Sequence, residues 1–160
     1  YPGGPVMDEK STEGDPEFYD FPRAMINNGF EFSFSGLKTS VRYFLDDKQS
    51  ENAEYLDEHM ADICASVAHA ITDVLVVKLK RAVEHHSVKN AILAGGVAAN
   101  SMLRSKVDKW AQEEGISVFV PDIAYCTDNA AMIAVTAYLK AQRNELDDVG
   151  LQPFARLSEQ

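Results

Sequence analysis

The stretch of residues 91–100, Ala-Ile-Leu-Ala-Gly-Gly-Val-Ala-Ala-Asn, constrains the fold more than any other. It joins a short apolar run to two adjacent glycines, Gly95 and Gly96, and then to a segment with helical spacing. In a parallel α/β sheet this order brings backbone N–H groups and a helix N-terminus to a nucleotide. A tight strand-to-helix turn without a ligand explains a Gly-Gly pair equally well. This stretch therefore predicts an α/β segment and leaves the ligand open.

A second stretch with the same order supports a binding site. Residues 121–134, Pro-Asp-Ile-Ala-Tyr-Cys-Thr-Asp-Asn-Ala-Ala-Met-Ile-Ala, follow another strand-like run and open onto another helix. Turns that follow neighbouring parallel strands converge on one crevice, at the carboxyl ends of those strands. We therefore expect the two stretches to form one site.

The first half of the chain is predicted to be mainly helical. Residues 1–31 are rich in Pro, Gly and acids, which favours loop with a short helix near 6–13. Apolar spacing then predicts a helix capped by Ser35, a polar linker at 46–54, and one long helix, or two with a bend, over 55–86. His85 and His86 are adjacent, so they cannot both face one metal from a helix and are expected to be exposed.

The second half is predicted to alternate between strands and helices. We expect strands at 89–94 and 116–121, a helix at 100–114 that Gly115 stops, and a last helix at 128–143 packed on the sheet. This makes a β-α-β-α segment at 89–143 after the helical segment at 32–86, both within one unit, 1–143, followed by an acidic tail at 144–160. Two strands are few for an α/β sheet, so further strands are expected to precede Tyr1 in a longer protein.

Composition excludes several classes of protein. With 160 residues and 46% hydrophobic content, the chain suits a globular domain with its own core. The formal net charge of −10 opposes autonomous binding to a polyphosphate backbone. Cys64 and Cys126 are interpreted as reduced thiols of a cytosolic protein. No uninterrupted apolar run approaches the ~20 residues of a membrane span.

Motifs along the chain resemble those of one known family. They are Tyr-Pro-Gly-Gly-Pro at 1–5, Phe-Pro-Arg at 21–23, Phe-Ser-Phe-Ser-Gly-Leu-Lys-Thr at 32–39, Gly-Gly-Val-Ala-Ala-Asn at 95–100 and Cys-Thr-Asp-Asn-Ala-Ala-Met-Ile-Ala at 126–134. In this order they resemble the carboxyl-terminal half of TsaD, formerly called Gcp or O-sialoglycoprotein endopeptidase. The resemblance implies part of an actin-like, Hsp70-like ATPase lobe with a ribonuclease-H-like fold.

The resemblance also implies an activity and its partners. The family transfers a threonylcarbamoyl group from threonylcarbamoyl-AMP to N6 of adenosine 37, in tRNAs that read codons starting with A. In bacteria it implies a paralogous subunit, TsaB, and a small ATPase, TsaE, in the cytoplasm. Whether the fragment forms a homodimer stays open.

Individual site residues follow from the resemblance. Asp128 matches a carboxylate ligand to Fe²⁺ or Zn²⁺, and Asn100 and Gly4 match substrate-binding residues. Gly95 and Gly96 match the adenosine-binding turn of the fold. From the residues alone, a helix N-cap is the favoured interpretation of Asp128, and a helix cap is also the alternative for Asn100. No general base is identified.

Parts of the family pattern lie outside this chain. The two histidines of a His-x-x-x-His metal motif and the Ser-Gly-Gly-His-Thr loop do not occur in it. We therefore expect the chain alone to hold metal poorly and to be inactive. The alternatives are a metalloendopeptidase, for which no His-Glu-x-x-His helix is found, a non-catalytic nucleotide-binding or assembly lobe, and a sugar kinase of the same superfold.

Overall fold

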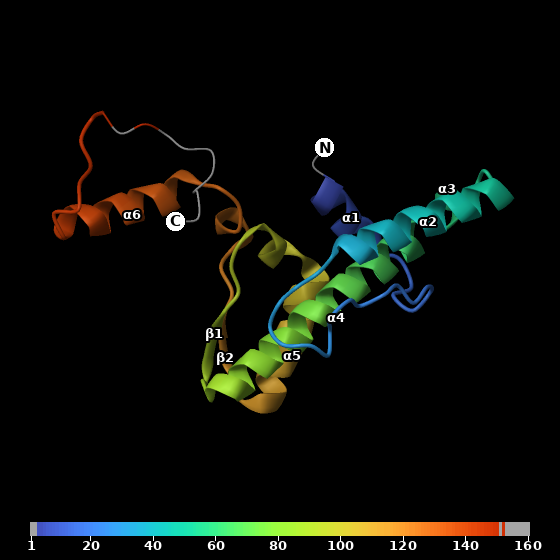
Figure 1. Ribbon diagram of the computed structural model, residues 1–160, viewed down its shortest axis with the longest axis horizontal. Coiled ribbons are helices and arrows are strands. Elements are labelled where there is room, and N and C mark those ends of the chain that lie inside the picture. The colour runs from blue at the N-terminus through green and yellow to red at the C-terminus, as the bar shows by residue number, and fades with distance from the viewer. Residues whose placement is uncertain (1–2, 151, 153–160) are drawn as a thin grey trace.

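A single long helix, α4 (Met60–His86), organises the molecule (Figure 1). The computed structural model describes residues 3–150 and 152. The short helix α3 (Tyr55–Glu58) precedes α4, and the break between them falls at His59. The predicted helical region at 55–86 is therefore confirmed as two helices. Residues along α4 alternate between buried and half-buried because the helix has neighbours on more than one side.

By composition, α4 is long and apolar enough to cross a membrane. Its apolar residues do not form an uninterrupted run, because Asp62, Asp73 and Lys78 lie among them. In the structure α4 contacts α1 (Gly3–Ser11) and α5 (Ser101–Glu114), and it contributes to two hydrophobic clusters. This packing is typical of the central helix of a protein core.

The amino-terminal helices are longer than predicted. Helix α1 begins at Gly3, where loop was expected. Helix α2 (Ser35–Glu51) continues through 46–51, so the predicted polar linker at 46–54 is wrong over most of its length. Lys48 Nζ donates to Glu51 Oε2 at 2.7 Å, an i,i+3 contact that supports this exposed end of the helix. Ser35 is the first residue of α2, and Phe34 occupies the N-cap without a side-chain hydrogen bond.

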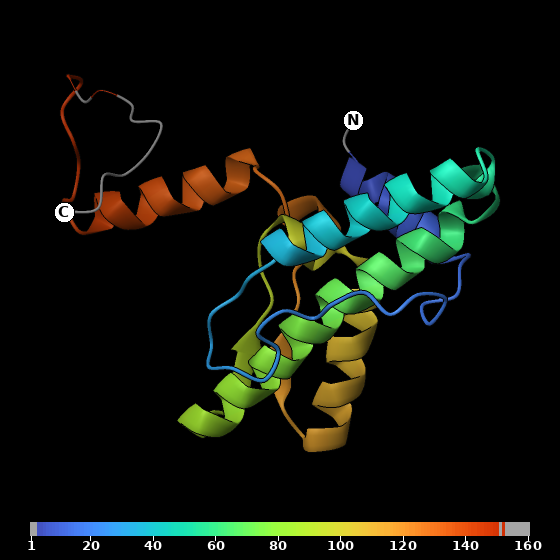
Figure 2. The same ribbon diagram turned by 45° about the vertical axis from the view of Figure 1, so that its right-hand side comes forward.

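Two hydrophobic clusters lie along α4. The first joins α4 to α2 and to the loop between α1 and α2, with Phe21, Leu37, Phe44, Ile63 and Ala70 buried in it. The second joins α4 to α5 through Val76, Leu103 and Val107, with half-buried residues of the strand region packed against it. Figure 2 shows α2 and α5 on different sides of α4, as these clusters require.

The predicted parallel strand pair is confirmed. Strand β1 (Asn90–Ile92) pairs with β2 (Ser117–Phe119) in parallel, with Ala91 opposite Val118, and α5 forms the connection. Helix α5 ends at Gly115, whose φ of 66° is a left-handed conformation that glycine adopts without strain. The inner face of the pair packs toward α4 and α5, while Ile92 and Phe119 on the outer face are 73% and 65% exposed.

The expected packing of the last helix on the sheet is wrong. Helix α6 (Ala130–Gln142) has no buried residue, and both ribbon views show it standing apart from the body of the molecule. Two three-residue strands offer little area to a helix of this length. The apolar side chains of α6 are consequently exposed: Met132, Ile133, Val135, Tyr138 and Leu139.

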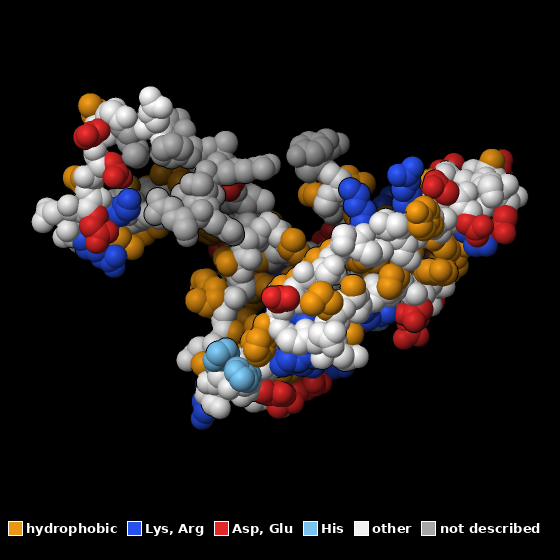
Figure 3. Space-filling model, viewed as in Figure 1, with side chains coloured by type: hydrophobic (Ala, Val, Ile, Leu, Met, Phe, Trp, Pro, Cys, Tyr) orange, Lys and Arg blue, Asp and Glu red, His pale blue; other side chains and the backbone are white. Residues whose placement is uncertain are grey.

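The histidine pair lies where it was expected. His85 and His86 are exposed in the last turn of α4. The surface at that end of the helix is pale blue in Figure 3. Phe30 lies beside them, with ring centroids 5.2 Å from His85 and 6.1 Å from His86.

Candidate functional site

The turn after β1 brings most of the predicted site residues together. Gly95 has φ of 87°, which only glycine adopts readily, and it precedes a short 3₁₀ helix, η1 (Gly96–Ala99). Asn100 follows and begins α5. Gly95 and Gly96 are both exposed, and a Cβ added to either would meet nothing within 4 Å. The backbone at this turn is therefore open to a ligand.

Asn100 serves as a helix cap. Its Oδ1 accepts a hydrogen bond from Leu103 N at 2.8 Å, which satisfies a backbone donor in the first turn of α5. Its side-chain amide also donates to Asp8 Oδ1 at 2.6 Å. The cap interpretation of Asn100 is confirmed, and the contact with Asp8 fixes the direction of the amide group.

Asp8 is a site residue that sequence reasoning missed. Its carboxylate also accepts hydrogen bonds from Ser101 N at 3.0 Å and Ser101 Oγ at 2.9 Å. An acid at a helix N-terminus is favoured by the partial positive charge there. Asp8 lies on α1 one turn after Gly4, so this contact ties the helix that carries Gly4 to the start of α5. The sequence carried no local signal for this contact, because Asp8 and Asn100 are 92 residues apart.

Asp128 lies in the loop between β2 and α6. It is exposed, and within residues 3–150 and 152 it has no hydrogen bond or ion pair partner. The cap of α6 is Asn129, whose Oδ1 accepts from Met132 N at 3.0 Å, so the cap interpretation of Asp128 is wrong. The described residues contain no group of three His, Cys, Asp or Glu side chains that could hold a metal. Asp128 can therefore offer one oxygen ligand but does not make a metal site by itself.

One side chain brings the two predicted stretches together. Arg104 on α5 donates from Nε to Ala98 O and from Nη2 to Pro121 O, both at 2.6 Å. The same Nη2 lies 3.2 Å from Cys126 Sγ, and Cys126 is 3% exposed. The segments after β1 and β2 therefore meet, as expected, through a residue that the sequence reasoning did not single out.

Two of the grooves in the described structure lie on its helical body. One, of about 970 Å³, runs along α2 beside Tyr19. The other, of about 470 Å³, lies between α1, α4 and α5 and is lined by Ser101, His69 and Lys106 among others. Neither of these two grooves is the crevice predicted between the two stretches.

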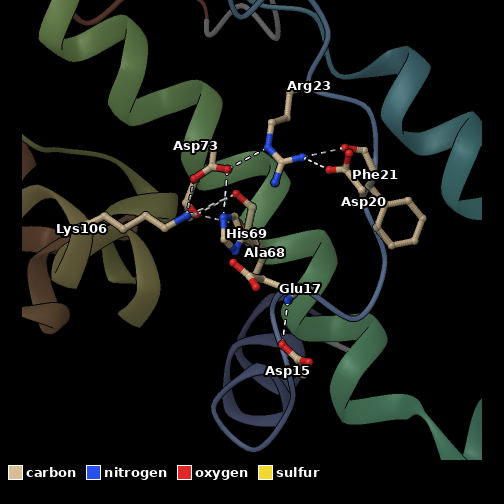
Figure 4. A network of polar contacts seen from close by, with 10 residues as sticks. Asp15, Glu17, Asp20, Phe21, Arg23, Ala68, His69, Asp73 and Lys106 are labelled. Atoms are coloured by element: carbon tan, nitrogen blue, oxygen red, sulfur yellow. Dashed lines mark hydrogen bonds and ion pairs between the residues drawn. The ribbon is translucent and has the colours of Figure 1, made fainter.

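A charged network behind the second groove links three parts of the chain (Figure 4). Asp73 on α4 accepts from Lys106 Nζ at 2.6 Å and from Arg23 Nε at 2.7 Å, and His69 Nε2 lies 3.0 Å away. Partial burial alone would raise the pKa of Asp73. The hydrogen bonds from Lys106 and Arg23, with their positive charges, outweigh burial and hold that pKa below its ordinary value.

The sequence matches the family that its motifs resemble. The model of the TsaD family, described as tRNA N6-adenosine threonylcarbamoyltransferase, matches residues 1–135. The chain belongs to the TsaD family. The match includes the turn at Gly95, the cap at Asn100 and the loop at Asp128.

The chain is also similar in sequence to individual members of the TsaD family. The chain is 42% identical over 158 residues to the tRNA N6-adenosine threonylcarbamoyltransferase of Porphyromonas gingivalis, covering 99% of this chain and 46% of that protein. It is 53% identical over 135 residues to the protein of the same name from Salinibacter ruber, covering 84% and 40%. The corresponding protein of Cytophaga hutchinsonii is 42% identical, with 98% and 46% covered. The chain thus spans just under half the length of these TsaD relatives.

Proposed function

We propose that the full-length protein containing this chain transfers a threonylcarbamoyl group from threonylcarbamoyl-AMP to N6 of adenosine 37 in tRNAs that read A-starting codons. The observation that carries this proposal is the linkage of Gly4 and Asn100 through Asp8. In this linkage, the helix that bears one predicted substrate residue binds the side chain of the other. Membership of the TsaD family supports the reaction class.

The arrangement suits an adenylate that lies over the turn after β1. The open backbone at Gly95 and Gly96 can approach a nucleotide without a side chain in the way. The amide of Asn100 can donate and accept hydrogen bonds, and its contact with Asp8 limits its rotation before a ligand arrives. These residues would bind and orient the adenylate, and the adenine amino group of the tRNA would then attack its carbamoyl carbon, with AMP leaving.

The proposal includes a metal ion for which this chain supplies only one ligand. We propose Asp128 as one ligand to Fe²⁺ or Zn²⁺, which would polarise oxygens of the substrate when bound. The described residues of this chain do not complete such a site. The remaining ligands would come from the rest of the full-length protein, so the chain alone is proposed to be inactive.

The remaining features follow the family resemblance. We propose that the chain is part of an actin-like, Hsp70-like ATPase lobe, and the helix-rich body with its parallel strand pair is compatible with that fold. TsaB-like and TsaE-like subunits are proposed partners in a cytoplasmic complex. Because the net charge of −10 disfavours contact with the tRNA backbone, we expect the partner subunits to supply part of the tRNA binding.

The test is a transfer assay with an unmodified tRNA that carries adenosine 37. This chain, supplemented with the missing amino-terminal portion, should transfer the threonylcarbamoyl group, and Asp128→Ala should abolish the transfer, since it removes a proposed metal ligand. Asp122→Ala is the matched control, since Asp122 is an exposed acid earlier in the same loop and should keep full activity. If the wild-type pieces associate and bind the adenylate without transfer, the chain is a nucleotide-binding or assembly lobe.

The metalloendopeptidase alternative is not favoured. The curated relatives are named as transferases, and no His-Glu-x-x-His pair occurs in the sequence.

A further inference from the structure

Arg104 stands where the two site segments meet. It lies in the first turn of α5, and its half-buried guanidinium hydrogen-bonds to Ala98 O, Pro121 O and Cys126 Sγ. Ala98 belongs to the segment that follows β1, and the other two residues belong to the segment that follows β2. One side chain therefore spans both.

The electrostatic setting of Arg104 shows that backbone carbonyls are its main partners. No carboxylate within residues 3–150 and 152 lies within 4 Å of its guanidinium. Taking a cation partly out of water without an acid partner is costly, and here the carbonyl oxygens of Ala98 and Pro121 offset that cost. The planar guanidinium presents its N–H groups in a fixed fork, so it can hold both carbonyls at once.

Two hydrogen-bond partners of Arg104 lie close in sequence to predicted site residues. Ala98 is two residues before Asn100, and Cys126 is two residues before Asp128. The Cys126 thiol also donates to Asp122 O at 3.6 Å, which ties the contact to the backbone of its own loop. Beyond the end of the β1–β2 pair, the guanidinium of Arg104 therefore bridges the Asn100 segment and the Asp128 segment.

We propose that Arg104 is a positioning residue for the transfer reaction, which fixes the segment after β1 relative to the segment after β2. This inference rests on the proposed function, because only then do both segments face one substrate. Arg104 acts through Asn100 and Asp128 and does not itself contact the reacting atoms. A misplacement of about 1 Å at a reacting centre can cost about a hundredfold in rate, so loss of this link should appear in kcat.

The experiment compares three variants of the full-length protein that contains this chain. Arg104→Gln removes the charge and the fork, and Arg104→Lys keeps the charge without the fork. Arg81→Gln is the matched control, because Arg81 also donates to two backbone carbonyls, of Gly29 at 2.6 Å and Ile26 at 2.8 Å, in a different loop. Hydrogen exchange by mass spectrometry and the kcat and KM of transfer are measured for each.

The proposal predicts a pattern that a general loss of stability would not produce. Arg104→Gln should speed exchange in both 95–100 and 121–127 and lower kcat roughly tenfold to hundredfold, with the KM for tRNA unchanged. Arg104→Lys should recover kcat only in part. Arg81→Gln should speed exchange around 25–30 and leave kcat within about twofold of wild type.

Three results would overturn the proposal. The first is unchanged exchange in either segment in Arg104→Gln, and the second is an unchanged kcat in the same variant. The third is full recovery of kcat in Arg104→Lys, which would make the positive charge the cause rather than the link between the segments. If the wild-type protein transfers nothing to tRNA, the proposed function fails separately, and the exchange data still decide whether Arg104 holds the segments together.

Discussion

Asn100 shows how one residue can satisfy a structural and a functional interpretation at once. Its Oδ1 caps α5 and its amide nitrogen binds Asp8. The two interpretations that the sequence left open therefore do not exclude each other. They use different atoms of the same amide, so substitutions can separate them.

The first prediction concerns the side-chain oxygen and nitrogen of Asn100. Asn100→Ala should lower the free energy of unfolding by about 1 kcal/mol through loss of the cap, whereas Asn100→Ser should keep most of it because serine is a good cap. Both should lose threonylcarbamoyl transfer in the full-length protein, since neither keeps the amide. Urea denaturation and the transfer assay measure the two effects. Full activity in Asn100→Ser would reduce Asn100 to a cap.

At the scale of elements, helices and strands with a regular apolar pattern were the predictable part. The body of α4, the strand pair and the stop of α5 at Gly115 follow from side-chain periodicity and glycine conformation, which are local properties. The extension of α2 to Glu51 and the start of α1 at Gly3 were missed. Their sequences are polar or rich in Gly and Pro, so local patterns there favour loop.

The second prediction concerns the crossing of the loop after α1 over the start of α4. A Cβ added to Gly14 would overlap the backbone of Ala61 and Asp62, and backbone cannot move aside cheaply. Gly14→Ala should therefore destabilise the fold by about 1–3 kcal/mol in urea denaturation. Gly36→Ala is the control, since Gly36 is helical and has open space around it, and it should be neutral or slightly stabilising. Equal stability of the two variants would contradict this close approach.

At the scale of the whole molecule, polar contacts between distant segments hold the loop at 12–34 along α4. Asp15 N donates to Asp62 Oδ1 at 2.8 Å, and Lys78 Nζ donates to Asn28 O at 2.6 Å. Lys78 is 2% exposed, and this burial, helped by the charge of Arg81, lowers its pKa. The Asp73 network adds α5 to the same arrangement.

The third prediction is a pH dependence that belongs to this network. The pKa of Asp73 is lowered on folding, so the carboxylate stabilises the fold above its unfolded pKa of about 3.9, and this contribution is lost as pH falls through the folded value. Asp73→Asn should cost about 1–3 kcal/mol at pH 7 in urea denaturation, and the difference from wild type should shrink below about pH 4.

The control for the Asp73→Asn variant is Asp57→Asn. Asp57 is an exposed acid, without a hydrogen bond in the described part of the chain, so its variant should differ little from wild type at any pH. A constant difference between Asp73→Asn and wild type from pH 7 to pH 3 would show that the network contributes through packing rather than charge.

The sequence by itself determined the local features of this protein: the parallel strand order, the glycine turn, the cap at Asn100 and the resemblance that placed the chain in the TsaD family. Only the tertiary structure showed that Asp8 binds Asn100, that Arg104 joins the segments after β1 and β2, and that α6 stands free of the sheet. The physical reason is the sequence separation over which each kind of interaction acts. Periodicity and turn chemistry act between residues within a few positions, whereas Asp8 and Asn100 meet across 92 residues because α1, α4 and α5 pack together.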